Sequence, residues 1–253
     1  MIELDNVTVR LGERTVLDGV DLTVRRGETM VILGASGSGK STILRVIIGL
    51  VRPDAGRVLI DGEDVTAYTE REWNKVRRRM GMVFQYSALF DSMTVGDNVA
   101  FGLRRRGLPE DEVQAEVAAA LARVGLDGWQ AAMPANLSGG MKKRVSLARA
   151  LATHPEIVLY DEPTAGLDPI RSATVDRLVM ETQRTLQTTA VVVTHELVSA
   201  RKIADRMAFL HEGRFLEMAP TERFLQSREP LVQQFLRGEE TLAETRVTEG
   251  DRR

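Results

Sequence analysis

The sequence contains no cysteine, no long apolar run and almost no net charge, and each absence excludes a class of protein. Without cysteine, the fold cannot depend on disulfides. No apolar run approaches the roughly 18 residues that a membrane-spanning helix needs, so we expect that the chain does not cross a bilayer by itself. The opening stretch, MIELDNVTVR, lacks the basic and then apolar layout of a signal peptide, and we therefore expect a cytoplasmic protein.

The charge balance argues against a nucleic-acid partner. The formal net charge is -2 at pH 7, so no overall field attracts a polyanion. Residues 77–79 and 104–106 are short runs of arginine, but neither is interleaved with the aromatic side chains that stack on bases. We interpret both runs as solvated faces or as contacts with a protein partner.

The pattern of apolar residues predicts an α/β fold. A chain of 253 residues is long enough for a large core. Near the N-terminus polar and apolar side chains alternate, as at Val9 and Leu11, which predicts an antiparallel β subdomain. Residues 30–33, 157–160 and 190–193 are apolar runs without a polar face, which predicts central strands of a mainly parallel sheet. Each run ends in polar or glycine residues, at the edge where such sheets bind ligands.

A helical subdomain is predicted between the first two of these runs, over about residues 86–154. Its clearest helical pattern runs from Pro109 to Gly125, with proline near the start and glycine at the end. We predict a single domain over residues 1–236 and a polar, flexible tail over residues 237–253.

The sequence GASGSGKS, at residues 34–41, has the spacing G-x-x-x-x-G-K-[ST] of a phosphate-binding loop. It follows a predicted buried strand and precedes an apolar-periodic helix. Glycine allows the backbone to curl with its amides toward phosphate oxygens. Lys40 would then reach the β- and γ-phosphates, and the Ser41 hydroxyl would bind Mg²⁺. We predict ATP and Mg²⁺ as ligands, with nucleotide contacts from Gly34, Ala35, Ser36, Gly37, Ser38, Gly39, Lys40, Ser41 and Thr42.

Polar side chains follow other predicted strands at the same edge of the sheet. Asp161 and Glu162 come directly after an apolar run, where Asp161 suits Mg²⁺ ligation and Glu162 suits the general base that polarises the attacking water. Gln85 follows GMVF and His195 follows VVVT, and both would face the γ-phosphate and its water. Gln85 is also a candidate Mg²⁺ ligand. Glu162 therefore predicts hydrolysis rather than binding alone.

A second glycine turn, Ser138-Gly139-Gly140, precedes the predicted helix MKKRVSLARALA. Unpaired amides and the positive end of a helix dipole form an anion site there. The turn has no lysine, metal ligand or base of its own, so it can hold a γ-phosphate only if another surface presents the nucleotide. We predict a second copy of the chain, arranged head to tail, as that surface. Lys142, Lys143 and Arg149 lie off the apolar stripe of this helix.

These motifs, in this order, resemble the ATP-binding cassette (ABC) family from about Ile2 to Leu236. The matches are GASGSGKS (Walker A), Gln85 (Q-loop), LSGGM (signature), IVLYDE (Walker B), AGLD at residues 165–168 (D-loop) and His195 (switch). The resemblance implies a P-loop NTPase fold and a sandwich dimer that binds two ATP. It further implies partner γ-phosphate contacts for Ser138, Gly139 and Gly140, a place at the dimer seam for Asp168, and a γ-phosphate contact for His195.

The sequence departs from the usual family pattern at two positions. Leu11 stands where the family usually has an aromatic residue that stacks on adenine, which leaves open how adenine is held. Met141 replaces the usual glutamine of the signature. Two longer segments of the sequence, LFDSMTVGDNVAFGLR and LSGGMKKRVSLARALA, resemble the ATPases of Mla/Mce-type phospholipid transporters. That resemblance implies separate integral-membrane permease subunits, a Mce-type lipid-binding protein and a place on the cytoplasmic face of the inner membrane.

Two alternatives remain, the first within the transporters and the second in another functional class. One is the ATPase of an importer for amino acids or other small polar solutes. The other is an ABC protein that acts on ribosomes or DNA, but such members carry two cassettes, a long coiled coil or zinc modules, none of which this sequence has. For a transporter, we predict that residues 86–93, around Leu89 and Phe90, help to form the groove for a cytoplasmic helix of the permease.

Overall fold

A computed structural model of the chain describes residues 1–239. The strands are β1 (Ile2–Leu11), β2 (Arg14–Val24), β3 (Thr29–Leu33), β4 (Ala55–Ile60), β5 (Glu63–Asp64), β6 (Met80–Val83), β7 (Ile157–Asp161), β8 (Thr189–Val193), β9 (Arg206–His211) and β10 (Arg214–Pro220). The helices are α1 (Lys40–Ile47), α2 (Glu70–Arg77), α3 (Val95–Arg105), α4 (Glu110–Arg123), the 3₁₀ helix η1 (Pro134–Asn136), α5 (Gly139–Leu151), α6 (Pro169–Leu186), α7 (Leu197–Ile203), α8 (Thr221–Phe224) and α9 (Pro230–Arg237). Most of the predicted tail lies outside the described residues.

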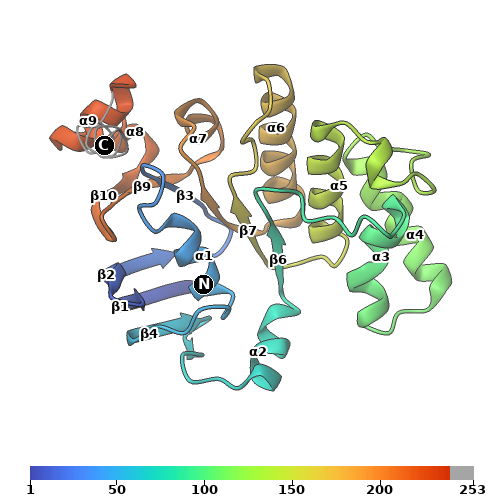
Figure 1. Cartoon of the computed structure of the whole chain (residues 1–253), viewed down its shortest axis with the longest axis horizontal. Helices are drawn as coiled ribbons and strands as arrows, with labels where there is room; N and C mark the ends of the chain where they lie inside the picture. The colour runs from blue at the N-terminus through green and yellow to red at the C-terminus, as the bar shows by residue number, and fades with distance from the viewer. Residues whose placement is uncertain (240–253) are drawn as a thin grey trace, which may run out of the picture.

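Within residues 1–239 the strands form two sheets (Figure 1). The larger has the order β10-β9-β3-β8-β7-β6, and each pairing in it is parallel except that of β10 with β9. The smaller is antiparallel and has the order β2-β1-β4-β5. The predicted fold class, a mainly parallel sheet with an N-terminal antiparallel subdomain, is confirmed.

The central strands are buried on both faces because successive side chains enter different cores. Met30 and Ile32 of β3 pack with α1 and the N-terminal sheet. Val31 and Leu33 pack on the other face, with residues of α5 and α6. The same alternation holds in β7 and β8. This double burial explains why these strands have no polar face in the sequence.

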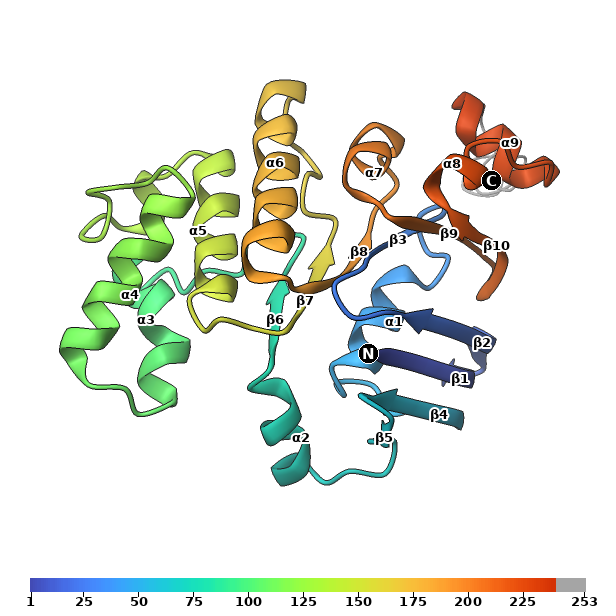
Figure 2. The same ribbon diagram turned by 180° about the vertical axis from the view of Figure 1, so that it is seen from behind.

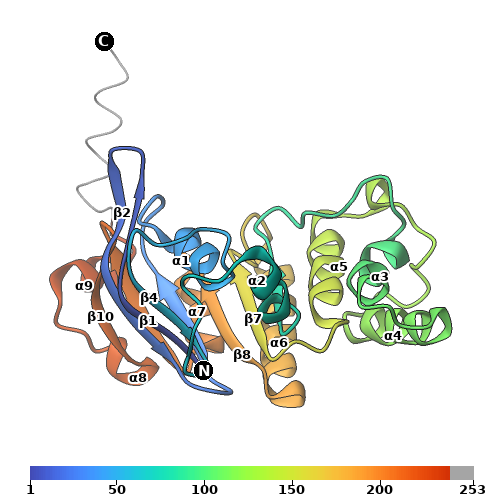
Figure 3. The ribbon, with the colours of Figure 1, turned by 90° about the horizontal axis from the view of Figure 1, so that it is seen from below.

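The inserted helices α3, α4 and α5 lie at one end of the molecule, away from the N-terminal sheet (Figures 1 and 3). The helix predicted from Pro109 to Gly125 is confirmed, since α4 has Pro109 as its N-cap and Gly125 has a φ of +65° after its end. Helix α5 contacts α3, α4 and β6, and it stands beside α6 in the view from behind (Figure 2). Thus α5 connects the helical insert to the parallel sheet.

The two arginine runs are largely paired within the chain. Arg79 forms an ion pair with Glu156 at 2.8 Å, and Arg104 forms one with Glu110 at 2.8 Å. Arg106 donates to the backbone oxygen of Thr153 at 2.6 Å. The carboxylates of Glu156 and Glu110 offset part of the positive charge of the two runs. Among residues 1–239, no helix combines the length and apolarity that crossing a bilayer requires.

We predict that Leu44→Ala lowers the free energy of unfolding by about 2–5 kcal/mol, because Leu44 of α1 is fully buried between the two sheets. The matched control is Leu50→Ala, since Leu50 is 59% exposed and its truncation should change stability by less than about 0.5 kcal/mol. Urea denaturation followed by circular dichroism measures both values. Equal losses in the two variants would contradict the assigned core.

Candidate functional site

The strand order of the large sheet brings the predicted site residues to one edge. Ile32 pairs with Val193, and Val193 pairs with Asp161, so the loops after β3, β8 and β7 begin side by side. Strand β6 pairs with β7 and adds the loop that carries Gln85. A cavity of about 360 Å³ opens at this edge, lined by Leu11, Arg14, Val16, Ser36, Gly37, Gly39, Lys40, Ser41, Thr42, Gln85, Glu162 and His195.

The loop after β3 has a backbone that requires glycine. Gly39 has a φ of +107°, and a Cβ there would lie 2.9 Å from the side chain of Leu17. Lys40 is buried and its Nζ donates to the carbonyl oxygens of Gly34 at 2.7 Å and Ala35 at 2.8 Å. Burial lowers the pKa of Lys40, against the opposing effect of nearby carboxylates. The Ser38 hydroxyl oxygen is buried and finds no partner within residues 1–239, as expected where a ligand supplies one.

The hydroxyl and carboxylate predicted for a metal lie together. Ser41 Oγ donates to Asp161 Oδ1 at 2.8 Å. Burial raises the pKa of Asp161, while the Ser41 hydrogen bond lowers it. Mg²⁺ prefers hard oxygen ligands and commonly takes one or two carboxylates together with substrate phosphates. This donor set, with Gln85 on the same cavity, therefore fits Mg²⁺. The described residues contain no cluster of three or more His, Cys, Asp or Glu side chains suited to a metal.

Glu162 and His195 face each other across the ends of β7 and β8. Glu162 Oε2 lies 3.0 Å from His195 Nδ1 and accepts a hydrogen bond from the His195 backbone N–H at 3.4 Å. Glu162 is buried, and its own N–H donates to Val193 O at 2.9 Å. Its φ of +47° is uncommon for a residue with a Cβ, and such strain is concentrated at functional sites. The geometry suits a carboxylate base held by a half-exposed imidazole.

The structure adds a residue that the sequence reasoning missed. Lys143 of α5 is buried, and its Nζ donates to the carbonyl oxygens of Gln85 and, at 3.2 Å, of Glu162. Burial lowers the pKa of Lys143. The sequence placed this lysine off the apolar stripe, where lysine is normally solvated. Nothing in the local pattern distinguishes it from its neighbour Lys142, because its partners come from distant strands.

The mouth of the cavity contains Leu11. Leu11 continues the apolar alternation of the first strand, but its side chain is 54% exposed. Strand β1 ends at Leu11 and the chain turns through Gly12, beyond the edge of the core. Leu11 instead lines the cavity beside Val16. Arg14 lies at the same mouth and its Nη2 donates to Gly37 O at 3.4 Å.

The second glycine turn lies elsewhere. Ser138 and Gly140 line a separate cavity of about 180 Å³. Ser138 caps α5, since its Oγ accepts a hydrogen bond from Met141 N–H at 3.3 Å. Asp168 caps α6 and accepts from Arg171 N–H at 3.0 Å. Within one chain, neither the turn nor Asp168 contributes to the cavity at the phosphate loop.

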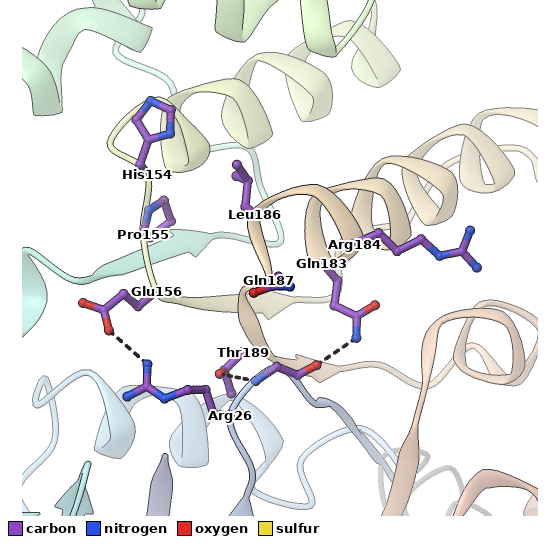
Figure 4. Close-up of a pocket in the computed structure, with 10 residues that line it drawn as sticks. Arg26, His154, Pro155, Glu156, Gln183, Arg184, Leu186, Gln187 and Thr189 are labelled. Atoms are coloured by element: carbon purple, nitrogen blue, oxygen red, sulfur yellow. Dashed lines mark hydrogen bonds and ion pairs between the residues drawn. The ribbon is translucent and has the colours of Figure 1, made fainter.

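A larger cavity, of about 690 Å³, opens at the opposite edge of the sheet, near the amino ends of β7 and β8 (Figure 4). Some of its polar side chains have partners among the residues that line it. Arg26 lies 3.4 Å from Glu156, and Gln183 donates to Gly27 O at 2.9 Å. The cavity of about 360 Å³ is instead lined by six of the nine phosphate-loop residues predicted to bind nucleotide, Ser36, Gly37, Gly39, Lys40, Ser41 and Thr42, so we assign the site there.

Comparison with known proteins identifies one family, and the similar proteins within it belong to several kinds of transporter. The family described as "ABC transporter" matches residues 17–165. The chain is 42% identical over 238 residues to the probable ribonucleotide transport ATP-binding protein mkl of Mycobacterium tuberculosis, with 94% of this chain and 66% of that protein covered. It is 40% identical over 240 residues to the intermembrane phospholipid transport system ATP-binding protein MlaF of Haemophilus influenzae, with 94% and 91% covered. It is 46% identical over 221 residues to the methionine import ATP-binding protein MetN of Xanthomonas campestris pv. campestris, with 87% and 66% covered.

Solved structures agree with this picture. A dimeric post-hydrolysis state of the ATP-binding cassette MJ0796 bound to ADP and Pi superposes with a TM-score of 0.81 and 33% identity, covering 87% of this chain and 99% of that one. The structure of cbiO1 from Clostridium perfringens, part of the ABC transporter complex cbiONQ, superposes with a TM-score of 0.83 and 30% identity, covering 98% of both chains.

We predict that Leu11→Tyr tightens ATP binding about fivefold, because an aromatic ring at the cavity mouth adds about 1 kcal/mol of stacking on adenine. Leu50→Tyr is the control, since Leu50 is equally exposed but lies on another cavity. Equilibrium dialysis with radiolabelled ATP measures both dissociation constants. Unchanged affinity in Leu11→Tyr would mean that adenine does not lie against position 11.

Proposed function

Because the chain belongs to the ABC transporter family and is an ABC ATPase, we propose that it powers phospholipid transport through separate membrane permease subunits. The observation that carries the phospholipid assignment is the match to MlaF, which extends over 91% of that protein. The chain spans only 66% of the length of the mkl and MetN relatives. The signature motif LSGGM, with Met141 at its fifth position, supports the same assignment.

A second candidate is an importer of small polar solutes. MetN, a methionine import ATP-binding protein, is the relative with the higher identity, at 46% over 221 residues. The ATPase core does not identify the transported substrate, because an ATPase subunit contacts its permease and not the transported molecule. The mkl relative, a probable ribonucleotide transport protein, extends the range of candidate substrates.

We assign the chemical roles from the geometry at the sheet edge. The amides of residues 34–42 and the Lys40 ammonium would bind the β- and γ-phosphates. Bound Mg²⁺ would neutralise phosphate charge during transfer, and the residues that would hold it are Ser41, Asp161 and Gln85. Glu162 would accept a proton from the attacking water, while His195, 3.0 Å from Glu162, would orient that carboxylate and contact the γ-phosphate.

The separation of the two glycine sites supports a working dimer. Each phosphate loop lies in one cavity and each Ser138-Gly139-Gly140 turn lies on another, so one chain offers two half-sites. A head-to-tail pair would join each loop to the partner's turn, with Asp168 at the seam. The similar cassette MJ0796 is described as dimeric, which supports this arrangement. Closure of the pair would then depend on bound ATP.

We also propose the place of the permease contact. Tyr86, just after Gln85, is 83% exposed, and Phe84 and Phe90 are partly exposed on the same stretch of chain. This apolar surface is suited to a cytoplasmic helix of a permease, which would hold the chain on the cytoplasmic face of the membrane. The relative cbiO1 is part of a transporter complex, which supports a membrane partner. A Mce-type lipid-binding protein would complete a phospholipid system.

We predict that Glu162→Gln lowers the ATPase kcat by at least about 100-fold and traps an ATP-bound dimer, because the base is lost while the phosphate contacts remain. Size-exclusion chromatography with light scattering, with and without MgATP, measures the dimer. Glu196→Gln is the control, since Glu196 caps α7 and does not line the nucleotide cavity. Normal turnover by Glu162→Gln would remove Glu162 from the role of base.

The substrate is tested by purifying the tagged chain with its native membrane partners and reconstituting the complex in phospholipid vesicles. We expect the co-purified proteins to include a permease and a lipid-binding protein. We also expect ATP-dependent transfer of a fluorescent phospholipid. The same complex is assayed with radiolabelled methionine. ATP-dependent uptake of methionine without phospholipid transfer would reject the phospholipid assignment and favour the second candidate.

A further inference from the structure

Helix α5 has two positively charged side chains that reach the same stretch of chain. We call this stretch the β6–α3 segment and define it as residues 84–94, between the end of β6 and the start of α3. It includes Gln85 at the nucleotide cavity and the exposed Tyr86. The two side chains belong to Lys143 and Arg149. Their helix begins at the glycine turn that is proposed to meet the partner's ATP.

Each cation binds backbone oxygens of the β6–α3 segment. Lys143 donates to the carbonyl oxygen of Gln85, and at 3.2 Å to that of Glu162. Arg149 donates to the carbonyl oxygen of Ser87 at 3.1 Å and to that of Ala88 at 2.6 Å. Hydrogen bonds from charged donors are among the stronger ones in proteins. The segment is therefore attached to α5 at Gln85, Ser87 and Ala88.

The backbone that these cations hold is strained. Ser87 has a φ of +31° and Ala88 has a φ of +46°, values that residues with a Cβ rarely adopt. Such a conformation is costly for a residue with a Cβ and persists only where its surroundings impose it. The carbonyl groups of these same two residues accept from Arg149. Loss of Arg149 should therefore release the segment rather than leave its shape unchanged.

The far end of the segment is held by a different helix. Asn98 of α3 is fully buried, and its Oδ1 accepts from Phe90 N–H at 2.8 Å. Its amide nitrogen donates to the carbonyl oxygens of Phe90 at 3.1 Å and Met93 at 3.2 Å. The segment thus has one end fixed to α3, and the conformation of residues 85–88 depends on α5.

A comparison with Lys142 shows that a positive charge on α5 is not sufficient for contact with the β6–α3 segment. Lys142 is adjacent to Lys143 and only partly buried, and its side chain forms no hydrogen bond within residues 1–239. Lys143 is 6% exposed and bridges the loop after β6 to the loop after β7. It therefore links the carbonyl group of the proposed base to that of Gln85.

We propose that Lys143 and Arg149 are positioning residues. When the partner's ATP binds at the glycine turn, these two side chains transmit the displacement of α5 to the β6–α3 segment and to the backbone of Glu162. A helix is stiff, so a displacement at its first turn moves both side chains together. Lys143 and Arg149 then move residues 85–88, including the surface proposed for the permease. This inference rests on the proposed ATP-dependent dimer.

The natural absence of cysteine makes a direct test possible, since Tyr86→Cys gives a single site for a nitroxide spin label. The label is introduced into the full chain that also contains Glu162→Gln, which leaves the Glu162 carbonyl group in place. We expect MgATP to change the rotational correlation time of the label about twofold or more. The combination Lys143→Met with Arg149→Met should raise label mobility without ATP and abolish the ATP response. The control Lys142→Met should keep the response.

Turnover provides a second readout, measured in chains with Glu162 intact and without the label. We expect Lys143→Met to lower kcat about tenfold and to leave KM for ATP within about twofold, because the phosphate loop is not altered. Lys142→Met should keep both values. A parallel rise in KM with loss of thermal stability would show a general structural defect and overturn the positioning role of Lys143.

Light scattering on the labelled samples separates the two proposals. If no dimer forms with MgATP in the chain with native α5, the proposed trans site is wrong and this inference falls with it. If the dimer forms and the label responds equally in the Lys143→Met, Arg149→Met chain, only the inference is overturned. Should that chain fail to fold, Lys143→Gln and Arg149→Lys, which retain hydrogen-bond donors, are expected to lose at least about half of the response. An undiminished response in them would also overturn it.

Discussion

The parallel pairing of β3 with β8 and of β8 with β7 is the constraint on which the nucleotide site depends. This register puts the end of β3 beside that of β8 and Val193 beside Asp161, so the loops that follow share one edge. A slip of one residue would exchange the two faces of a strand and would move Asp161 away from Ser41, which it now contacts at 2.8 Å. Burial on both faces makes such a slip costly, because each strand fills a core on either side. The core packing that fixes the strand register therefore also fixes the positions of the polar residues at this edge.

The site concentrates charge in a small, poorly solvated volume. Asp161 and Glu162 are adjacent and both 7% exposed, and Lys40 and Lys143 are buried close by. Each of these groups has a polar partner within the chain, which offsets the cost of desolvation. The buried Ser38 hydroxyl has no partner within residues 1–239 and is left for a ligand. The glycine turn at Ser138 lies on a different cavity of the same chain, so it can reach a bound nucleotide only in a second copy of the chain.

Much of this was predictable from local sequence. The phosphate loop, the apolar runs of β3, β7 and β8, and the helix from Pro109 to Gly125 have short-range patterns with a direct physical meaning. The exposure of Leu11 could not be predicted, because alternation does not reveal where a strand passes the edge of its core. The roles of Lys143 and Arg149 could not be predicted, since their partners are distant in sequence and lysine on a helix is usually solvated. The cargo is beyond the sequence of an ATPase subunit for a similar reason: no residue of this chain is expected to contact it.

Mixing two inactive variants tests whether each ATP site is built from two chains. Lys40→Met removes the phosphate-loop lysine, and Gly139→Asp introduces a negative charge at the glycine turn. Each variant alone would contain two defective sites, whereas a mixed dimer would contain one intact site. An equal mixture should therefore recover about a quarter of the native ATPase rate, because about half of the dimers are mixed and each has one working site. No recovery in a mixture in which mixed dimers are detected would contradict an ATP site built from two chains.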